Sequence, residues 1–220
     1  MGKGFRIMYK QNLKRLLDLA ISACALGVLW PLFGVLSLWI RLDSPGPVLF
    51  RQKRFARDEA YFEILKFRTM RTDTPKDMPT HLLDNPDQFI TRSGRFLRKT
   101  SLDELPQLIN IFKGEMSFIG PRPALWNQED LMALRKENGS SHCRPGLSGW
   151  AQIHGRDELC IEDKAALDGY YADHIGFRLD LICFFGTFLS VFRQEGIVEG
   201  RQNANPSGSA ASLQGSRISQ

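Results

Sequence analysis

The chain has 220 residues, of which 43% are hydrophobic and 24% are charged, and its net charge is +5. This composition is that of a globular protein long enough to bury a core, and the basic balance allows nucleic acid, anionic lipid or phosphorylated substrates as partners. The four cysteines have no paired spacing, which argues against a disulfide-built secreted scaffold.

An apolar stretch from Leu19 to Ile40 follows a basic N-terminal segment. Its length of about 22 residues is enough to span a bilayer, and it is too long for a signal peptide. Pro31 lies in its middle and predicts a break or kink, while cations flank both ends, so the positive-inside rule gives no direction. Residues 1–43 are therefore predicted to form a basic segment and a re-entrant membrane helix. A helix that spans the membrane is the alternative.

Two short runs of alternating apolar and polar residues follow, Val48 to Arg54 and Tyr61 to Phe67. They predict a β-hairpin, whose connection lacks glycine and leaves the turn type open. Lys66 and Arg68 lie at the end of the second run and could reach a phosphate. A solvated strand end explains the same two cations equally well.

The stretch from Thr91 to Pro123 concentrates charged residues of both signs. Two adjacent carboxylates, Asp103 and Glu104, follow a cluster of cations and precede an apolar segment at helical spacing; the cations are Arg92, Arg95, Arg98 and Lys99. Arg122 comes last, between two prolines of fixed φ. Carboxylates among arginines suit a site that binds polyphosphate through the cations and a metal ion or phosphorus through the acids.

A structural explanation of the acidic pair is also open. Ser101 and Glu104 have the spacing of a helix capping box, and acidic residues are favoured in the first turn of any helix. Pro106 weakens this interpretation, because it would fall where an intrahelical N–H is already needed. Such a conflict between local rules is typical of functional sites.

The glycine-rich segment from Arg144 to Arg156 is a further candidate for ligand binding. Its backbone N–H groups could cradle a nucleotide, with Trp150 stacking on a base, although Trp150 as a core anchor is the favoured interpretation. A zinc site is not expected, because no C-x-x-C or H-x-x-x-H pair anchors the nearby histidines and cysteines, which are His142, Cys143, His154 and Cys160.

The remaining segments predict helices and a tail. Helical patterns cover 126–138, 161–174 and 179–192, the last being apolar nearly all round and either buried or in the membrane interface. Residues 201–220 are rich in Ser, Gly and Ala and predict a disordered tail. The fold class is thus mainly α with a small β-hairpin (α+β), with the main domain at 44–200.

Four blocks of the sequence resemble the bacterial sugar transferase family, the monotopic polyprenol-phosphate phosphoglycosyl transferases. The blocks are SPGPVLFRQ (44–52), KFRTM (66–70), SLDELPQLINIFKGEMSFIGPRP (101–123) and RPGLSGWAQ (144–152). They occur in the family's order over residues 10 to 195, which is far more specific than one short motif. The resemblance also implies the re-entrant membrane helix and makes residues 44–200 a cytoplasmic catalytic domain.

The resemblance implies transfer of a sugar 1-phosphate from a UDP-sugar to polyprenol (undecaprenyl) phosphate, with release of UMP, at the cytoplasmic face of the bacterial inner membrane. This would be the first membrane step of surface polysaccharide or glycoconjugate assembly. It makes Asp103 the covalent nucleophile and gives Glu104 a catalytic role, with Mg²⁺ held by Asp103 or Glu104. The expected phosphate-binding residues are Arg98, Arg122, Arg68, Lys66 and Arg156. Nucleic acid is not an expected partner, and the sequence leaves the oligomeric state and the sugar open.

Two other functions remain as alternatives. A non-catalytic membrane-anchored binding module would explain the basic charge but not the acidic pair within it. A glycosyltransferase that moves the sugar alone would release UDP rather than UMP. The nucleotide released therefore separates the two enzymatic alternatives.

Overall fold

The computed structural model describes residues 8–74, 86–155 and 159–193. Helices dominate, and the described residues contain two sheets of two strands each. The prediction of a mainly helical α+β protein with a small hairpin is confirmed. The expected tail at 201–220 and the candidate phosphate-binding residue Arg156 lie outside the described residues.

The apolar N-terminal stretch forms one long helix, α2 (Lys14–Asp43), which follows a short π-helical turn at Tyr9–Leu13. Among the described residues it is the one helix long and apolar enough to cross a membrane. Pro31 lies inside α2, and the helix continues on both sides of it. The predicted division into two half-helices is therefore not confirmed, and re-entry into the membrane stays a prediction.

Both ends of α2 are fastened to the rest of the protein. Near its start, Arg15 donates hydrogen bonds to the carbonyls of Ile111 and Phe112. At its end, Asp43 accepts hydrogen bonds from the backbone N–H and the hydroxyl of Ser93. Between the ends, partly buried apolar residues of α2 pack on two of the core clusters. The helix therefore lies against the domain from one end to the other.

The predicted hairpin is confirmed as β1 (Leu49–Phe55) and β2 (Tyr61–Phe67), antiparallel with Phe55 opposite Tyr61. Its connection includes a 3₁₀ turn at Arg57–Glu59, in which Asp58 and Glu59 have φ values of 58° and 60°. Side chains rather than glycines hold this left-handed turn. Asp58 contacts the His142 ring and Glu59 pairs with Lys136.

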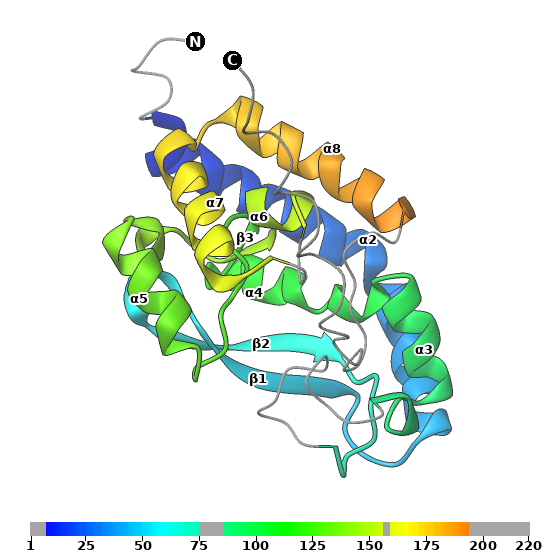
Figure 1. The fold of residues 1–220 in the computed structure, drawn as a ribbon. Coiled ribbons are helices and arrows are strands. Elements are labelled where there is room, and N and C mark those ends of the chain that lie inside the picture. Colours follow the sequence, from blue (N-terminus) through cyan, green and yellow to red (C-terminus); the bar gives the residue numbers. More distant parts are fainter. Residues whose placement is uncertain (1–7, 75–85, 156–158, 194–220) are drawn as a thin grey trace, which may run out of the picture.

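The charged stretch forms three short helical elements, α3 (Arg92–Lys99), a 3₁₀ turn (Leu102–Glu104) and α4 (Gln107–Lys113). In Figure 1, α4 lies between the hairpin and α2, and it contacts both. Gly114 ends α4 with φ of 88° in the left-handed region, which glycine adopts without strain. A 3₁₀ turn at Pro86–Gln88 precedes α3.

The C-terminal half contains a sheet that the sequence did not predict. β3 (Ser117–Ile119) pairs in parallel with β4 (Gly146–Ser148). The helices around it are α5 (Glu129–Glu137), a 3₁₀ turn (Ser140–His142), α6 (Trp150–Ile153), α7 (Ile161–His174) and α8 (Phe177–Arg193). The predicted helices at 126–138, 161–174 and 179–192 correspond to α5, α7 and α8.

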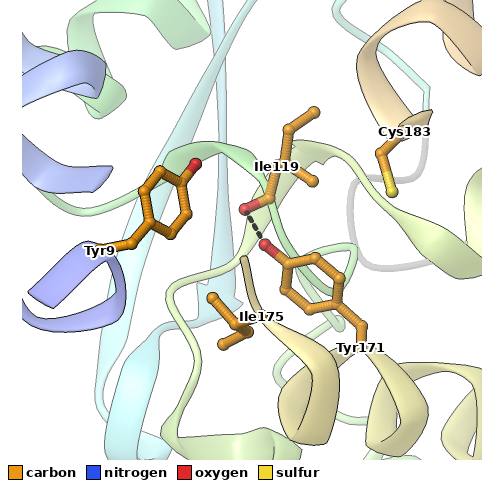
Figure 2. Close-up of a cluster of buried hydrophobic side chains, with 5 residues drawn as sticks. All are labelled: Tyr9, Ile119, Tyr171, Ile175 and Cys183. Carbon is orange, nitrogen blue, oxygen red and sulfur yellow. Dashed lines mark hydrogen bonds between the residues drawn. The ribbon is translucent and has the colours of Figure 1, made fainter. Parts of the chain in front are cut away.

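Buried polar contacts join these helices to β3. Figure 2 shows the Tyr171 hydroxyl pointing at the Ile119 carbonyl, to which it donates a hydrogen bond of 3.1 Å. The same hydroxyl lies 2.7 Å from Asp180 Oδ1, so its single proton is shared between the two acceptors. The Tyr9 hydroxyl donates to Asp180 Oδ2, which also pairs with Lys14. Residues near the two ends of the described chain therefore meet at the last residue of β3.

Candidate active site

The two adjacent carboxylates lie on the 3₁₀ turn between α3 and α4. Leu102 and Leu105 flank them and pack into the hydrophobic core, so the turn is anchored on both sides of the acidic pair. The capping-box explanation is wrong, because Ser101 has φ of 56° and its side chain makes no cap hydrogen bond. α4 begins only after its N-cap, Pro106, so the proline's missing N–H interrupts no helical bond.

Lys66 joins the hairpin to the acidic pair. Its Nζ lies 2.8 Å from Glu104 Oε1 and 3.9 Å from Asp103 Oδ2. The lysine is at the end of β2, and the hairpin packs on α4 and the 3₁₀ turn, so two segments separated by nearly 40 residues of chain meet here. Lys66, for which a solvated strand end was an equal explanation in the sequence, thus contacts both members of the acidic pair.

Arg122 approaches the same carboxylate oxygen of Glu104 as Lys66 does. Its Nη2 lies 3.6 Å from Glu104 Oε1, and a third of its side chain is exposed. The loop that carries it, Gly120–Pro123, leaves the end of β3, with Pro121 and Pro123 both buried. The guanidinium is therefore held on a stiff loop while part of it stays open to a ligand.

Asp103 is the more enclosed of the two acids, with 9% of its surface exposed. Burial raises the pKa of its carboxyl, and the Glu104 charge raises it further, while Lys66 and Arg98 oppose both effects. Arg98, at the end of α3, thus acts on Asp103 through its charge. A carboxylate that is poorly hydrated but balanced by cations is suited to act as a nucleophile.

Arg68 lies at the C-terminal end of α2 and not at the acidic pair. Its guanidinium is buried and donates to the Ser44 and Pro45 carbonyls and the Ser44 hydroxyl, with a longer contact to Ile40 O, at the C-terminal end of α2. A buried cation needs such oxygens to replace its water. The structure therefore does not bring Arg68 to the acidic pair, and its contacts favour a role in fastening α2.

Asn110, which the sequence did not single out, holds the hairpin against α4. Its Oδ1 accepts a hydrogen bond from Leu65 N, and its Nδ2 donates to Glu63 O and to the Glu115 carboxylate. The amide therefore pairs with the free edge of β2 as a neighbouring strand would. Because Lys66 follows Leu65 directly, Asn110 sets where the lysine stands relative to the acidic pair.

We expect Asn110→Ala to lower the free energy of unfolding by about 3 kcal/mol, since it leaves buried β2 groups without partners. Turnover should fall as well, because Lys66 loses its fixed position. Thermal unfolding and steady-state kinetics of the full chain in detergent would measure both. Asn12→Ala, which removes an exposed asparagine ahead of α2, is the control and should keep wild-type stability. Wild-type stability in Asn110→Ala would contradict this account.

Asp103 and Glu104 are the residues of the candidate site that could hold a metal ion. Among the described residues, no group of three or more His, Cys, Asp or Glu side chains is placed to hold a metal ion. Asp103 and Glu104 alone offer two carboxylates. Mg²⁺ is commonly bound by one or two carboxylates together with substrate phosphates, and this donor set fits that arrangement.

Trp150 belongs to the edge of the core. It packs on the cluster of Figure 2 and stacks on Tyr170, with ring centroids 5.3 Å apart, while the His154 ring lies 4.2 Å away. These contacts agree with the favoured interpretation of Trp150 as an anchor.

A family model described as bacterial sugar transferase matches residues 9–194. An undecaprenyl-phosphate glucose phosphotransferase from Komagataeibacter xylinus is 39% identical over 186 residues, which cover 79% of this chain and 35% of the relative. The uncharacterized sugar transferase EpsL of Bacillus subtilis is 39% identical over 186 residues, covering 84% of this chain and 90% of the relative. A UDP-N-acetylgalactosamine-undecaprenyl-phosphate N-acetylgalactosaminephosphotransferase from Aeromonas hydrophila is 34% identical over 188 residues, which cover 81% of this chain and 43% of the relative.

The family model therefore matches nearly all of the residues that the structure describes. The chain spans about a third of the length of the Komagataeibacter relative and nine-tenths of the Bacillus relative. The names of two of these relatives specify different sugars, glucose and N-acetylgalactosamine.

Proposed function

Because the chain belongs to the bacterial sugar transferase family, we propose that it transfers a sugar 1-phosphate from a UDP-sugar to polyprenol (undecaprenyl) phosphate and releases UMP. The observation that supports this proposal is the buried Asp103 carboxylate, whose neighbour Glu104 contacts both Lys66 and Arg122. The product would enter surface polysaccharide or glycoconjugate assembly.

In the first step, an Asp103 carboxylate oxygen attacks the β-phosphorus of the UDP-sugar. The bond between this phosphorus and the bridging oxygen breaks, and UMP leaves with that oxygen. The sugar phosphate stays on Asp103 as an acyl phosphate ester. We propose that Lys66 and Arg122 hold the phosphate oxygens, where charge builds up in the transition state, since the planar fork of an arginine can donate two hydrogen bonds at once.

In the second step, an oxygen of polyprenol phosphate attacks the same phosphorus. The acyl phosphate bond breaks, the Asp103 carboxylate is restored, and the sugar is left on a lipid diphosphate. We propose that Glu104, which contacts both Lys66 and Arg122, helps to orient the incoming phosphate through these cations. Bound Mg²⁺, held by Asp103 or Glu104 with substrate oxygens, would neutralise the diphosphate charge.

The attachment of α2 supports a membrane protein that stays on one side of the bilayer. A helix of 30 residues is about 45 Å long, more than the roughly 30 Å of a hydrocarbon core. Its two ends contact the same domain, so a crossing would carry part of that domain through the lipid. Val28, Val35 and Leu42, which are spaced seven residues apart along α2, expose 64% or more of their surface and offer lipid an apolar face. The proposed location is the cytoplasmic face of the inner membrane.

Cysteine labelling tests this topology. We expect Asn12→Cys and Arg41→Cys, each in a chain with its four native cysteines replaced by alanine, to react with a membrane-impermeant maleimide only after cells are opened. Asp58→Cys, on the exposed hairpin turn, is the control and should behave in the same way. Labelling of one α2 end in intact spheroplasts would show that the helix crosses the membrane.

Nucleotide release tests the proposed reaction. Detergent-solubilised protein would be incubated with Mg²⁺, polyprenol phosphate and a panel of UDP-sugars that includes UDP-glucose and UDP-N-acetylgalactosamine. We expect UMP and a lipid diphosphate sugar from at least one donor. Release of UDP would indicate a glycosyltransferase, and no nucleotide from any donor would leave a binding module.

A further inference from the structure

Gln152 is buried with no partner for its carboxamide. It exposes 6% of its surface, and both Oε1 and Nε2 are enclosed without a hydrogen-bond partner. Among the residues that the structure describes, it is the one side chain with two such atoms. Buried amides are nearly always hydrogen-bonded, so a side chain with both ends unsatisfied needs an explanation. Asn110 shows the usual situation, with all its bonds made inside the protein.

The position of Gln152 links it to the proposed active site. β3 and β4 run parallel, and the loop that follows β3 carries Arg122, while the turn of helix that follows β4 carries Gln152. The two segments touch, because a Cβ on Gly149 would lie 2.1 Å from Gly120 O and 2.7 Å from Gln152 Oε1. Ligands of α/β proteins commonly bind beyond the carboxyl ends of parallel strands. Gln152 and Arg122 therefore emerge from neighbouring segments at one such edge.

The chemistry of the amide indicates which part of a donor it would bind. Phosphate oxygens only accept hydrogen bonds and would leave Oε1 unsatisfied, and Lys66 and Arg122 already supply cations for them. A group that both donates and accepts would satisfy both ends of the carboxamide. In a nucleotide sugar, the uracil imide edge and the sugar hydroxyls have this property. Since the amide makes no bond in the protein, turning it toward a ligand breaks none.

We propose that Gln152 binds a neutral hydrogen-bonding group of the nucleotide sugar, either the uracil or a sugar hydroxyl, beside the phosphate contacts of Arg122. This inference rests on the proposed function, because it presupposes a UDP-sugar donor. Gln152 would bind the neutral part of the donor, whereas the other residues assigned to the site are charged.

The test compares Gln152→Met with wild type for thermal stability, KM for the UDP-sugar and inhibition by UMP. Methionine has a similar shape and no polar group, so the melting temperature should stay the same or rise, because no hydrogen bond is lost. KM for the UDP-sugar should rise about tenfold. Weaker inhibition by UMP to the same extent would identify uracil as the group, and unchanged inhibition by UMP would identify the sugar.

Asn138→Met is the matched control. Asn138 donates to Ala165 O and accepts from Ser140 N, between α5 and α7, so its loss should lower the melting temperature and leave KM unchanged. The same behaviour in Gln152→Met would overturn the proposal, since it would show an amide satisfied by water in a structural role. Wild-type protein that turns over no UDP-sugar would instead overturn the proposed function. Turnover by wild type with an unchanged KM in Gln152→Met would overturn this inference alone.

Discussion

Asp103→Asn is expected to lower kcat by about 10⁴-fold or more, because an amide cannot form the acyl phosphate on which both steps depend. Asparagine has the same shape as aspartate and removes a buried charge, so the fold should keep its stability. Turnover measured as UMP release, together with thermal unfolding and the fraction of protein recovered with membranes, separates loss of chemistry from loss of structure.

Two variants make this result specific. Glu129→Gln removes an exposed carboxylate from the first turn of α5 and should have wild-type kinetics. Asp103→Glu keeps the charge but moves the carboxylate by one methylene, and it should retain more activity than Asp103→Asn while remaining well below wild type. Substantial turnover by Asp103→Asn, or an equal loss of membrane association, would contradict the assigned role.

Lys66→Met is expected to lower kcat by roughly 100-fold, because it removes the cation that contacts both carboxylates. It should also shift the pH dependence. Burial already raises the pKa of Asp103 above its usual range, and Lys66 is the largest influence that lowers it. Without Lys66 the pKa rises further, so the carboxylate forms only at higher pH. The acid limb of the kcat profile should therefore move to higher pH, and the loss should be greatest at low pH.

The control for this variant lies on the same hairpin. Lys53→Met removes an exposed lysine whose Nζ lies over the Tyr61 ring, away from the acidic pair, and should leave kcat and the pH profile unchanged. Lys66→Arg keeps the charge and should preserve the position of the acid limb. A Lys66→Met enzyme with an unshifted acid limb would show that the lysine does not act on Asp103.

The sequence predicted the parts of the structure that depend on local pattern. Alternation predicted the hairpin, helical spacing predicted α5, α7 and α8, and Pro106 pointed to a conflict at the acidic pair. The structure resolves this conflict by starting α4 after the proline. The charged residues of the site could be predicted because Asp103, Glu104 and Arg122 lie within one short stretch of chain.

The contacts that assemble the site could not be predicted in this way. Lys66 reaches Glu104, and Asn110 reaches Leu65, across long separations that leave no periodic signal in the sequence. The strands β3 and β4 are three residues each, too short for alternation to reveal them. In the sequence, Arg68 could not be distinguished from the other cations of the candidate site. In the structure it lies against the C-terminal end of α2, where the Ser44 carbonyl accepts its hydrogen bond.

The covalent intermediate on Asp103 tests the central claim most directly. Protein would be incubated with its UDP-sugar and Mg²⁺ but without polyprenol phosphate, then examined by intact mass and peptide mapping while released nucleotide is counted. We expect one phosphosugar per chain on the peptide that contains Asp103, an equal amount of UMP, and neither in Asp103→Asn. UMP that appears only when polyprenol phosphate is added, with no adduct on the protein, would show direct transfer between the two substrates and contradict the account.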